Sequence, residues 1–128
     1  MALRIEHSLP FSADAVWDVV GDPARIDWVP GVESCEMEGD VRRFAMAGAG
    51  ELAERILLRD PAQRRLEYSV IASTPALEAH KAAIEVRPQP EGCLLIWETD
   101  VRPEAVEPFI RRSMEGALEQ LERVLGSA

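Results

Sequence analysis

Four side chains that can accept or transfer a proton fall among aliphatic neighbours in this sequence: Glu54, Tyr68, His80 and His7. Each occupies an alternating position in a segment whose other residues of the same parity are largely aliphatic. Because alternate side chains of an extended strand point to one face, we expect all four to point toward the protein interior. A buried carboxylate without a partner is costly or becomes protonated, so this placement needs a chemical reason.

The alternation is clearest around Glu54 and His80. Glu54 shares its parity with leucine or isoleucine at 52, 56 and 58, whereas Arg55 and Arg59 have the opposite parity. Since arginines mark the solvent side of a half-buried strand, Glu54 is expected inside. His80 alternates with the apolar residues at 82, 84 and 86, opposite Lys81, and is also expected inside.

Two interpretations of these polar residues remain open. Glu54 and His80 could form a polar spot in an apolar cavity, where they orient a hydroxyl or carbonyl of a ligand. They could also act as general base and acid, with Tyr68 as a proton donor. The structural alternative makes Glu54 a packing residue bonded to backbone or to an arginine at the cavity rim, with His80 partly in solvent. His7 is expected to support the sheet.

Further side chains are expected to line the same cavity. An aromatic wall gives a ligand large contact area at low entropy cost, and small residues on the long helix leave volume or permit close packing. The predicted ligand-contact residues are Glu54, Tyr68, His80, Trp97, Thr99, Phe109, Ser113, Met114 and Ala117; Glu54, His80 and Tyr68 are also the catalytic candidates. Trp17 is expected in the core, and Trp28 either at the cavity mouth or in plain packing.

The sequence gives little support for a metal or cofactor. Two histidines and one glutamate suffice in number for a metal, but no close spacing ties them together. Cys35 and Cys93 form no CxxC pair, and no histidine cluster lies beside either. We expect two free thiols, no metal and no cofactor.

Alternation and turn residues define the elements that must position these side chains. Segment 3–9 reads as a strand, Ser12 as the N-cap of a helix that stops at Gly21, and Pro23 as the start of a second short helix reaching about Trp28. Six more strands follow at 32–38, 41–47, 51–59, 65–72, 77–87 and 93–101. Their hairpin-length connections indicate an antiparallel meander. Segment 104–125 has the three-and-four apolar spacing of an amphipathic helix.

These elements predict an α+β fold in which a curved antiparallel sheet of about seven strands wraps around the long C-terminal helix. The 128 residues of the chain are a single-domain length, so we expect one domain, 1–128.

The net charge of −9 (14 basic and 23 acidic residues) repels phosphate backbones, so no nucleic-acid partner is expected. No apolar run approaches the ~20 residues that span a bilayer, and the N-terminus lacks a signal-peptide core. We therefore expect no membrane span and a cytoplasmic location.

Several short motifs follow one another along the chain in a characteristic order. They are residues 11–17 (FSADAVW), Asp22, residues 28–32 (WVPGV), Glu54, Asp60, Tyr68, residues 97–99 (WET) and the closing helix. Together, over about residues 3–125, they resemble the SRPBCC superfamily, with its START and birch-allergen-like helix-grip fold, and within it the polyketide cyclase/dehydrase-like branch. The segment before Arg42 and Arg43 lacks the Gly-rich approach that many relatives have to an arginine in the third strand, so neither arginine is assigned.

The resemblance implies a cavity between the sheet and the long helix that accepts a hydrophobic small molecule such as a lipid, sterol, quinone, polyketide or plant hormone. We hypothesise a protein that binds or transports such a molecule. One alternative is a polyketide cyclase/dehydratase-like enzyme that uses Glu54 and His80. Another is a protein-interaction module that exposes an apolar patch around Trp28, Val29 and Val32. A homodimer is compatible with all three.

Overall fold

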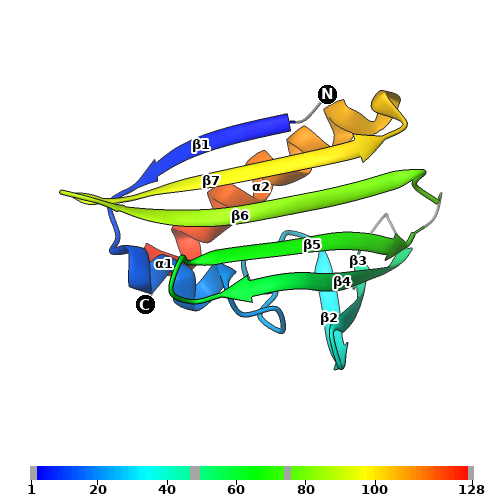
Figure 1. Ribbon diagram of the computed structural model, residues 1–128, viewed down its shortest axis with the longest axis horizontal. Helices are drawn as coiled ribbons and strands as arrows, with labels where there is room; N and C mark the ends of the chain where they lie inside the picture. The colour runs from blue at the N-terminus through cyan, green and yellow to red at the C-terminus, as the bar shows by residue number, and fades with distance from the viewer. Residues whose placement is uncertain (1–2, 47–49, 74–75, 127–128) are drawn as a thin grey trace.

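The computed structural model describes residues 3–46, 50–73 and 76–126 (Figure 1). Seven strands in these ranges form one antiparallel sheet in the order β1-β7-β6-β5-β4-β3-β2. The strands are β1 (Leu3–Leu9), β2 (Val32–Glu38), β3 (Val41–Met46), β4 (Gly50–Asp60), β5 (Arg65–Ala72), β6 (Ala79–Gln89) and β7 (Gly92–Arg102). The helices are α1 (Ala13–Val20), the short 3-10 helix η1 (Glu104–Val106) and α2 (Glu107–Gly126).

The predicted α+β helix-grip architecture is confirmed. All seven predicted strands form, and the ends of those within the described ranges lie within two residues of the expected positions. Residue 47, the expected end of the third strand, and the turn residues 48, 49, 74 and 75 lie outside the described residues. Helix α2 lies across one face of the sheet, behind β6 and β7 in the view of Figure 1. This face is called the inner face below.

The predicted second short helix is wrong. Residues 21–31 form successive turns, in which Arg25 donates its backbone N–H to the Asp22 carbonyl and Val29 donates to Ile26. The Asp22 carboxylate also accepts the backbone N–H of Ala24, at 3.0 Å. Such local side-chain bonds offer the backbone an alternative to a helical ladder. The resulting loop turns Trp28 into the core instead of leaving it on a helix surface.

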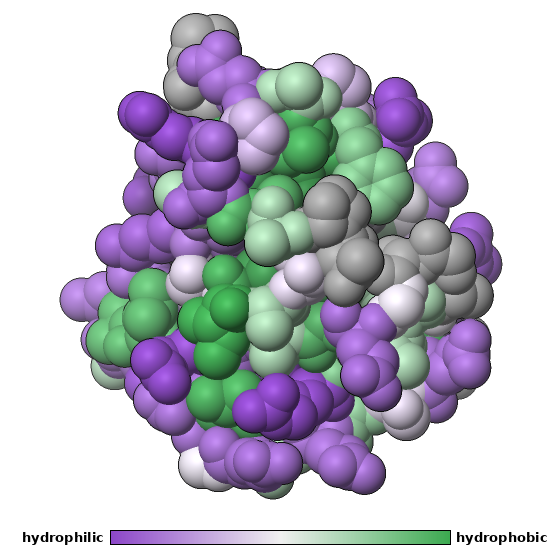
Figure 2. All heavy atoms as spheres, turned by 90° about the vertical axis from the view of Figure 1, so that its right-hand side faces the viewer, coloured by the Kyte–Doolittle hydropathy of each residue, from purple (hydrophilic) through white to green (hydrophobic). Residues whose placement is uncertain are grey.

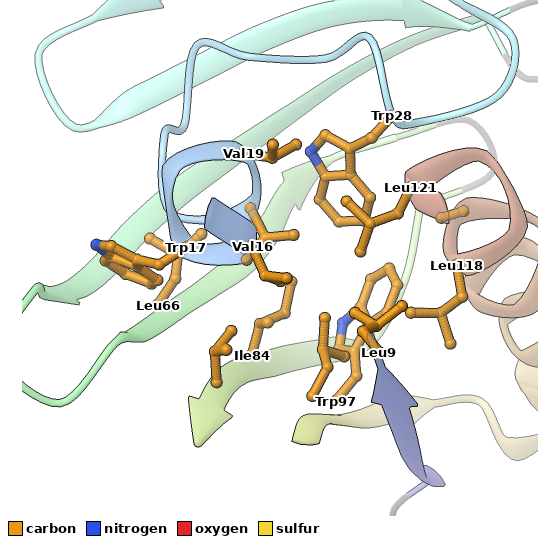
Figure 3. Packing of buried hydrophobic residues seen from close by; sticks show 14 of the residues in the cluster. Leu9, Val16, Trp17, Val19, Trp28, Leu66, Ile84, Trp97, Leu118 and Leu121 are labelled. Carbon is orange, nitrogen blue, oxygen red and sulfur yellow. The ribbon is translucent and has the colours of Figure 1, made fainter. Parts of the chain in front are cut away.

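Helix α1 begins and ends as its residues predict. The Ser12 side chain accepts the backbone N–H of Ala15 at 3.1 Å, and Gly21 is the C-cap. Figure 3 shows how its buried face meets the sheet and α2 in a cluster that includes Leu9, Val16, Trp17, Val19, Trp28, Leu66, Ile84, Trp97, Leu118 and Leu121. The prediction that Trp17 belongs to the core is confirmed. This cluster fills the end of the fold that α1 closes.

The outer face of the sheet carries charged side chains, as the alternation predicts. Arg65 pairs with Glu67 and Glu85, and Arg4 pairs with Glu6 and Glu98. The pairing of β4 with β5 is irregular at two points, between Ala53 and Glu54 and between Ile56 and Leu58. Irregular pairing between Ile56 and Leu58 shifts the register against β5, and Leu58, expected inside, is 39% exposed. A bulge adds a residue to one strand and therefore reverses the faces beyond it.

Candidate functional site

An ion pair lies on the inner face where β3 and β4 meet. Arg42 and Glu54 are register partners, and Arg42 Nε donates to Glu54 Oε1 at 2.7 Å. Arg42 Nη1 also donates to the backbone carbonyl of Pro23 at 3.1 Å. The two side chains are only 13% and 10% exposed, so the pair is almost fully desolvated. Glu54 is therefore buried and bonded to an arginine.

The ion pair is continuous with an aromatic wall. The guanidinium of Arg42 lies over the Tyr68 ring, 5.0 Å from its centroid. The Tyr68 hydroxyl accepts a hydrogen bond from Trp97 Nε1 at 3.1 Å, and the rings of Trp97 and Trp28 are 5.6 Å apart at their centroids. Side chains from β3, β4, β5, β7 and the loop of residues 21–31 thus converge. Trp28 is 5% exposed, so of its two predicted places it takes the packed one.

His80 closes a gap between β5 and β6. The ladder between these strands extends to the pair of Tyr68 and Ala82. Beyond it, His80 Nδ1 accepts the backbone N–H of Val70 at 3.0 Å, and the Ser69 hydroxyl donates to the His80 carbonyl. The imidazole thus takes the place of a backbone acceptor. Its ring lies 5.9 Å from the Tyr68 ring, so Tyr68 contacts both His80 and the ion pair.

Burial sets the protonation states of this cluster. It raises the pKa of Glu54, while the charge and hydrogen bond of Arg42 act in the opposite direction. Burial, with the nearby charge of Glu54, raises the pKa of the Tyr68 hydroxyl well above its usual range. Burial lowers the pKa of His80 from 6.5 to about 4. At neutral pH Tyr68 and His80 are uncharged, and because Nδ1 of His80 accepts a bond, its proton is on Nε2.

The lowered pKa of His80 predicts a pH-dependent loss of stability. The unfolded chain takes up a proton on this residue below pH 6.5 and the folded chain only near pH 4, so stability falls as the pH drops through that window. With one pKa unit worth about 1.4 kcal/mol, and allowing for partial exposure, we expect a loss of about 2 kcal/mol. His80→Asn keeps an acceptor for Val70 but cannot titrate. Urea unfolding from pH 7.5 to 4 should show wild type losing stability relative to this variant; parallel profiles would contradict the prediction.

The remaining predicted contact residues divide into two groups. Thr99 and Met114 are buried against each other, with the Thr99 hydroxyl donating to the Met114 sulfur at 3.5 Å, and Ala117 is buried beside them on α2. Phe109 and Ser113 are exposed instead, Phe109 to 55%, because they lie off the stripe of α2 that faces the sheet. These two side chains therefore do not join the buried cluster around Tyr68, and their contact with a ligand stays a prediction. His7 bonds to Glu122 of α2 at 3.2 Å, in keeping with its supporting role.

Arg42 is the site residue that the sequence interpretation missed. Phe44 and Met46 have its parity, so apolar neighbours marked its face as they marked that of Glu54. The register of the β3–β4 hairpin, in which Met46 pairs with Gly50, also places residue 42 opposite residue 54. The pairing register of β3 and β4 therefore contained the signal. It was obscured because Arg43, next to Arg42, belongs to the exposed face.

An apolar surface lies at the end of the molecule opposite α1. Figure 2 views the right-hand end of Figure 1 and shows hydrophobic side chains gathered across it, with hydrophilic ones around them. The end of β5 and the start of α2 lie at this end (Figure 1), and they carry the exposed side chains of Ile71 and Phe109. Both the sheet and α2 therefore contribute exposed apolar side chains at this end of the molecule.

A surface hollow of about 430 Å³ lies over β2, β3 and β4. Its lining combines Ser34, Arg43, Ala45 and Ala53 with Phe44 and Leu52, which have the parity of the inner face. It includes none of Arg42, Glu54, Tyr68 and His80, so this hollow is not the cluster around Tyr68. Within the described residues, no three His, Cys, Asp or Glu side chains are grouped as ligands of a metal ion. No helix in those ranges is long and apolar enough to cross a bilayer.

Solved structures with this architecture come from bacteria and plants. A Thermobifida fusca protein solved by NMR is 28% identical, covers 98% of this chain and 93% of its own, and superposes with a TM-score of 0.83. The protein XoxI of Bacillus cereus is 20% identical over 97% and 94% of the two chains (TM-score 0.88). Norcoclaurine synthase of Thalictrum flavum, solved with dopamine and hydroxybenzaldehyde, is 21% identical over 99% and 87% (TM-score 0.77). At the identities of the last two, the likeness shows the fold alone.

Sequence comparison gives the family. No curated protein matches the chain in sequence. The family described as polyketide cyclase/dehydrase and lipid transport matches residues 2–126, almost the whole chain. This match agrees with the helix-grip sheet, with α2 across its inner face, and with the structural likeness to norcoclaurine synthase. The chain therefore belongs to the polyketide cyclase/dehydrase and lipid transport family, within the SRPBCC superfamily.

Proposed function

We propose that this protein binds a hydrophobic small molecule between the inner face of the sheet and α2. The observation that supports it best is the convergence of Arg42, Glu54, Tyr68 and His80 on an inner face whose other side chains are mostly apolar. Burying polar groups costs stability that aliphatic side chains would not cost, and a binding site gives such a cluster a purpose. Trp97 supplies an aromatic wall next to it, and the apolar end seen in Figure 2 is the proposed entrance.

The same contacts favour binding over acid–base catalysis. A general base works best with a pKa near the working pH, and the pKa of His80 lies at about 4. Its Nδ1 lone pair is already used by the Val70 N–H, and Glu54 is held by Arg42. A cyclase or dehydratase using these groups would first have to break both interactions. We therefore place polar recognition, and not proton transfer, at the cluster.

The third hypothesis, a protein-interaction patch around Trp28, Val29 and Val32, has little support from the contacts. Trp28 is buried against Trp97, and Val29 and Val32 are half-buried. A docking patch needs contiguous exposed apolar area, which these three residues do not provide together.

Native mass spectrometry of freshly purified protein tests the proposed function. We expect an added mass that disappears on denaturation, or, for protein purified empty, saturable binding of the neutral fluorescent probe N-phenyl-1-naphthylamine. Val70→Trp fills the inner face beside Glu54 and should abolish binding, because Val70 is the register partner of Glu54. Arg55→Trp adds the same ring to the exposed face and should leave binding unchanged. Absence of both a bound mass and probe binding would refute the proposal.

A further inference from the structure

The polar cluster is electrically compensated. The positive charge of Arg42 lies 2.7 Å from the negative charge of Glu54, and Tyr68 and His80 are neutral at pH 7. Within the described part of the chain, the hydrogen bonds and ion pairs of these four residues involve no other charged group. A ligand that brought a full charge to this place would lose its hydration and gain no unpaired partner. Desolvation of an uncompensated charge is far more costly than that of a hydroxyl or carbonyl.

The hydrogen-bonding capacity of the cluster is mixed. The Tyr68 hydroxyl accepts from Trp97, so its own proton remains to be donated. His80 accepts at Nδ1 and carries its proton on Nε2, which is a second neutral donor. The carboxylate of Glu54 accepts from Arg42 through Oε1 and has a second acceptor oxygen. Neutral donors next to a carboxylate oxygen are suited to a ligand hydroxyl, which both donates and accepts, or to a ligand carbonyl, which accepts.

We propose that the cluster of Arg42, Glu54, Tyr68 and His80 selects an uncharged ligand bearing a hydroxyl or carbonyl, and rejects the corresponding carboxylate. This inference rests on the proposed function and adds the chemical class of its ligand. Glu54 is the residue that excludes the anion, because its charge cancels that of Arg42 and repels a second carboxylate. The negative surface of the chain, −9 overall, acts in the same direction at longer range.

Displacement of N-phenyl-1-naphthylamine by 1-decanol and by decanoate at pH 7.5 measures this preference on two ligands of equal chain length. We expect decanol to bind the wild-type protein at least about tenfold more tightly than decanoate does. In Glu54→Gln, Arg42 has no counter-ion, and the preference should reverse so that decanoate binds more tightly. Glu38→Gln removes an exposed carboxylate that pairs with Arg43 on the other face, and should keep the wild-type preference.

Since Glu54→Gln leaves a buried guanidinium unpaired and can impair folding, a second variant is needed. Arg42→Met combined with Glu54→Leu removes both charges, which well-packed apolar replacements tolerate. It should bind the probe but lose most of its discrimination between decanol and decanoate. Equal affinities in the wild-type protein, tighter binding of decanoate, or failure of both compounds to displace bound probe would overturn the inference while leaving the proposed function intact. Failure of the probe itself to bind would count against the proposed function.

Discussion

Replacing Arg42 alone by methionine should lower the free energy of unfolding by about 3 kcal/mol at pH 7.5, because it leaves the Glu54 carboxylate buried without its cation. The variant also loses the hydrogen bond to the Pro23 carbonyl and the contact with the Tyr68 ring. Urea unfolding followed by tryptophan fluorescence measures the loss. Arg43→Met removes the neighbouring arginine, which is 54% exposed and pairs loosely with Glu38, and should change stability by less than about 1 kcal/mol.

The pH dependence of this variant has a defined sign. Burial already raises the pKa of Glu54 above its ordinary value of 4.5, and removal of Arg42 raises it further. A carboxyl with a raised folded-state pKa favours folding below 4.5 and loses that contribution as the pH rises through the folded-state value. The deficit of Arg42→Met relative to wild type should therefore be small near pH 4.5 and largest at pH 7.5. A deficit that stays constant across this range would show that lost packing, not an unpaired charge, is responsible.

Gly92→Ala should lower the free energy of unfolding by about 3 kcal/mol or more, which is at least as much as Arg42→Met. Gly92 begins β7 with φ at +150°, and a Cβ on it would lie 2.0 Å from the carbonyl oxygen of Leu9. Leu9 pairs with Cys93 at the end of β1, so the clash forces the two strands apart. Backbone cannot move aside as a flexible side chain can, and overpacking of this kind costs several kcal/mol.

Gly39→Ala is the matched control for this prediction. Gly39 also has positive φ, +62°, but no atom would lie within 4 Å of an added Cβ. Gly39→Ala should lower the free energy of unfolding by only about 1 kcal/mol, the cost of a strained backbone without a clash. Thermal unfolding of the two variants, measured side by side, separates the cost of the clash from the cost of the strained backbone. Similar losses of stability for the two variants would mean that the clash of the added Cβ with the Leu9 carbonyl is relieved without cost, and would contradict the prediction.

Local patterns were enough to predict the elements of this fold. Alternation identified all seven strands, and the ends of β1, β2 and β5 fall at the expected residues. Ser12 and Gly21 marked the two ends of α1 because capping is a local interaction between a side chain and the nearest backbone groups. The false helix after Gly21 shows the limit of that logic. Pro23 is a good first helical residue, yet its carbonyl is used by Arg42, which lies 19 residues away in the sequence.

The candidate site was predicted only in part. Parity placed Glu54, Tyr68 and His80 on the inner face, because side-chain alternation is a property of each strand by itself. Parity could not show that Arg42 neutralises Glu54, since that depends on the register of two strands. Nor could it show that His80 replaces a ladder acceptor, which requires β5 and β6 to separate after Tyr68. Nor could the sequence show that Phe109 and Ser113 are exposed, because one turn of α2 can face either the sheet or solvent.

By itself the sequence determined the antiparallel meander, the amphipathic closing helix and the inward direction of the polar side chains, all of which follow from periodicity and turn chemistry along the chain. Only the tertiary structure decided the chemistry of those side chains. Arg42 and Glu54 become a compensated pair, and His80 becomes a neutral donor, through contacts between residues that are far apart in the sequence and through burial. Charge and protonation depend on neighbours and on access to water, and a linear pattern contains neither.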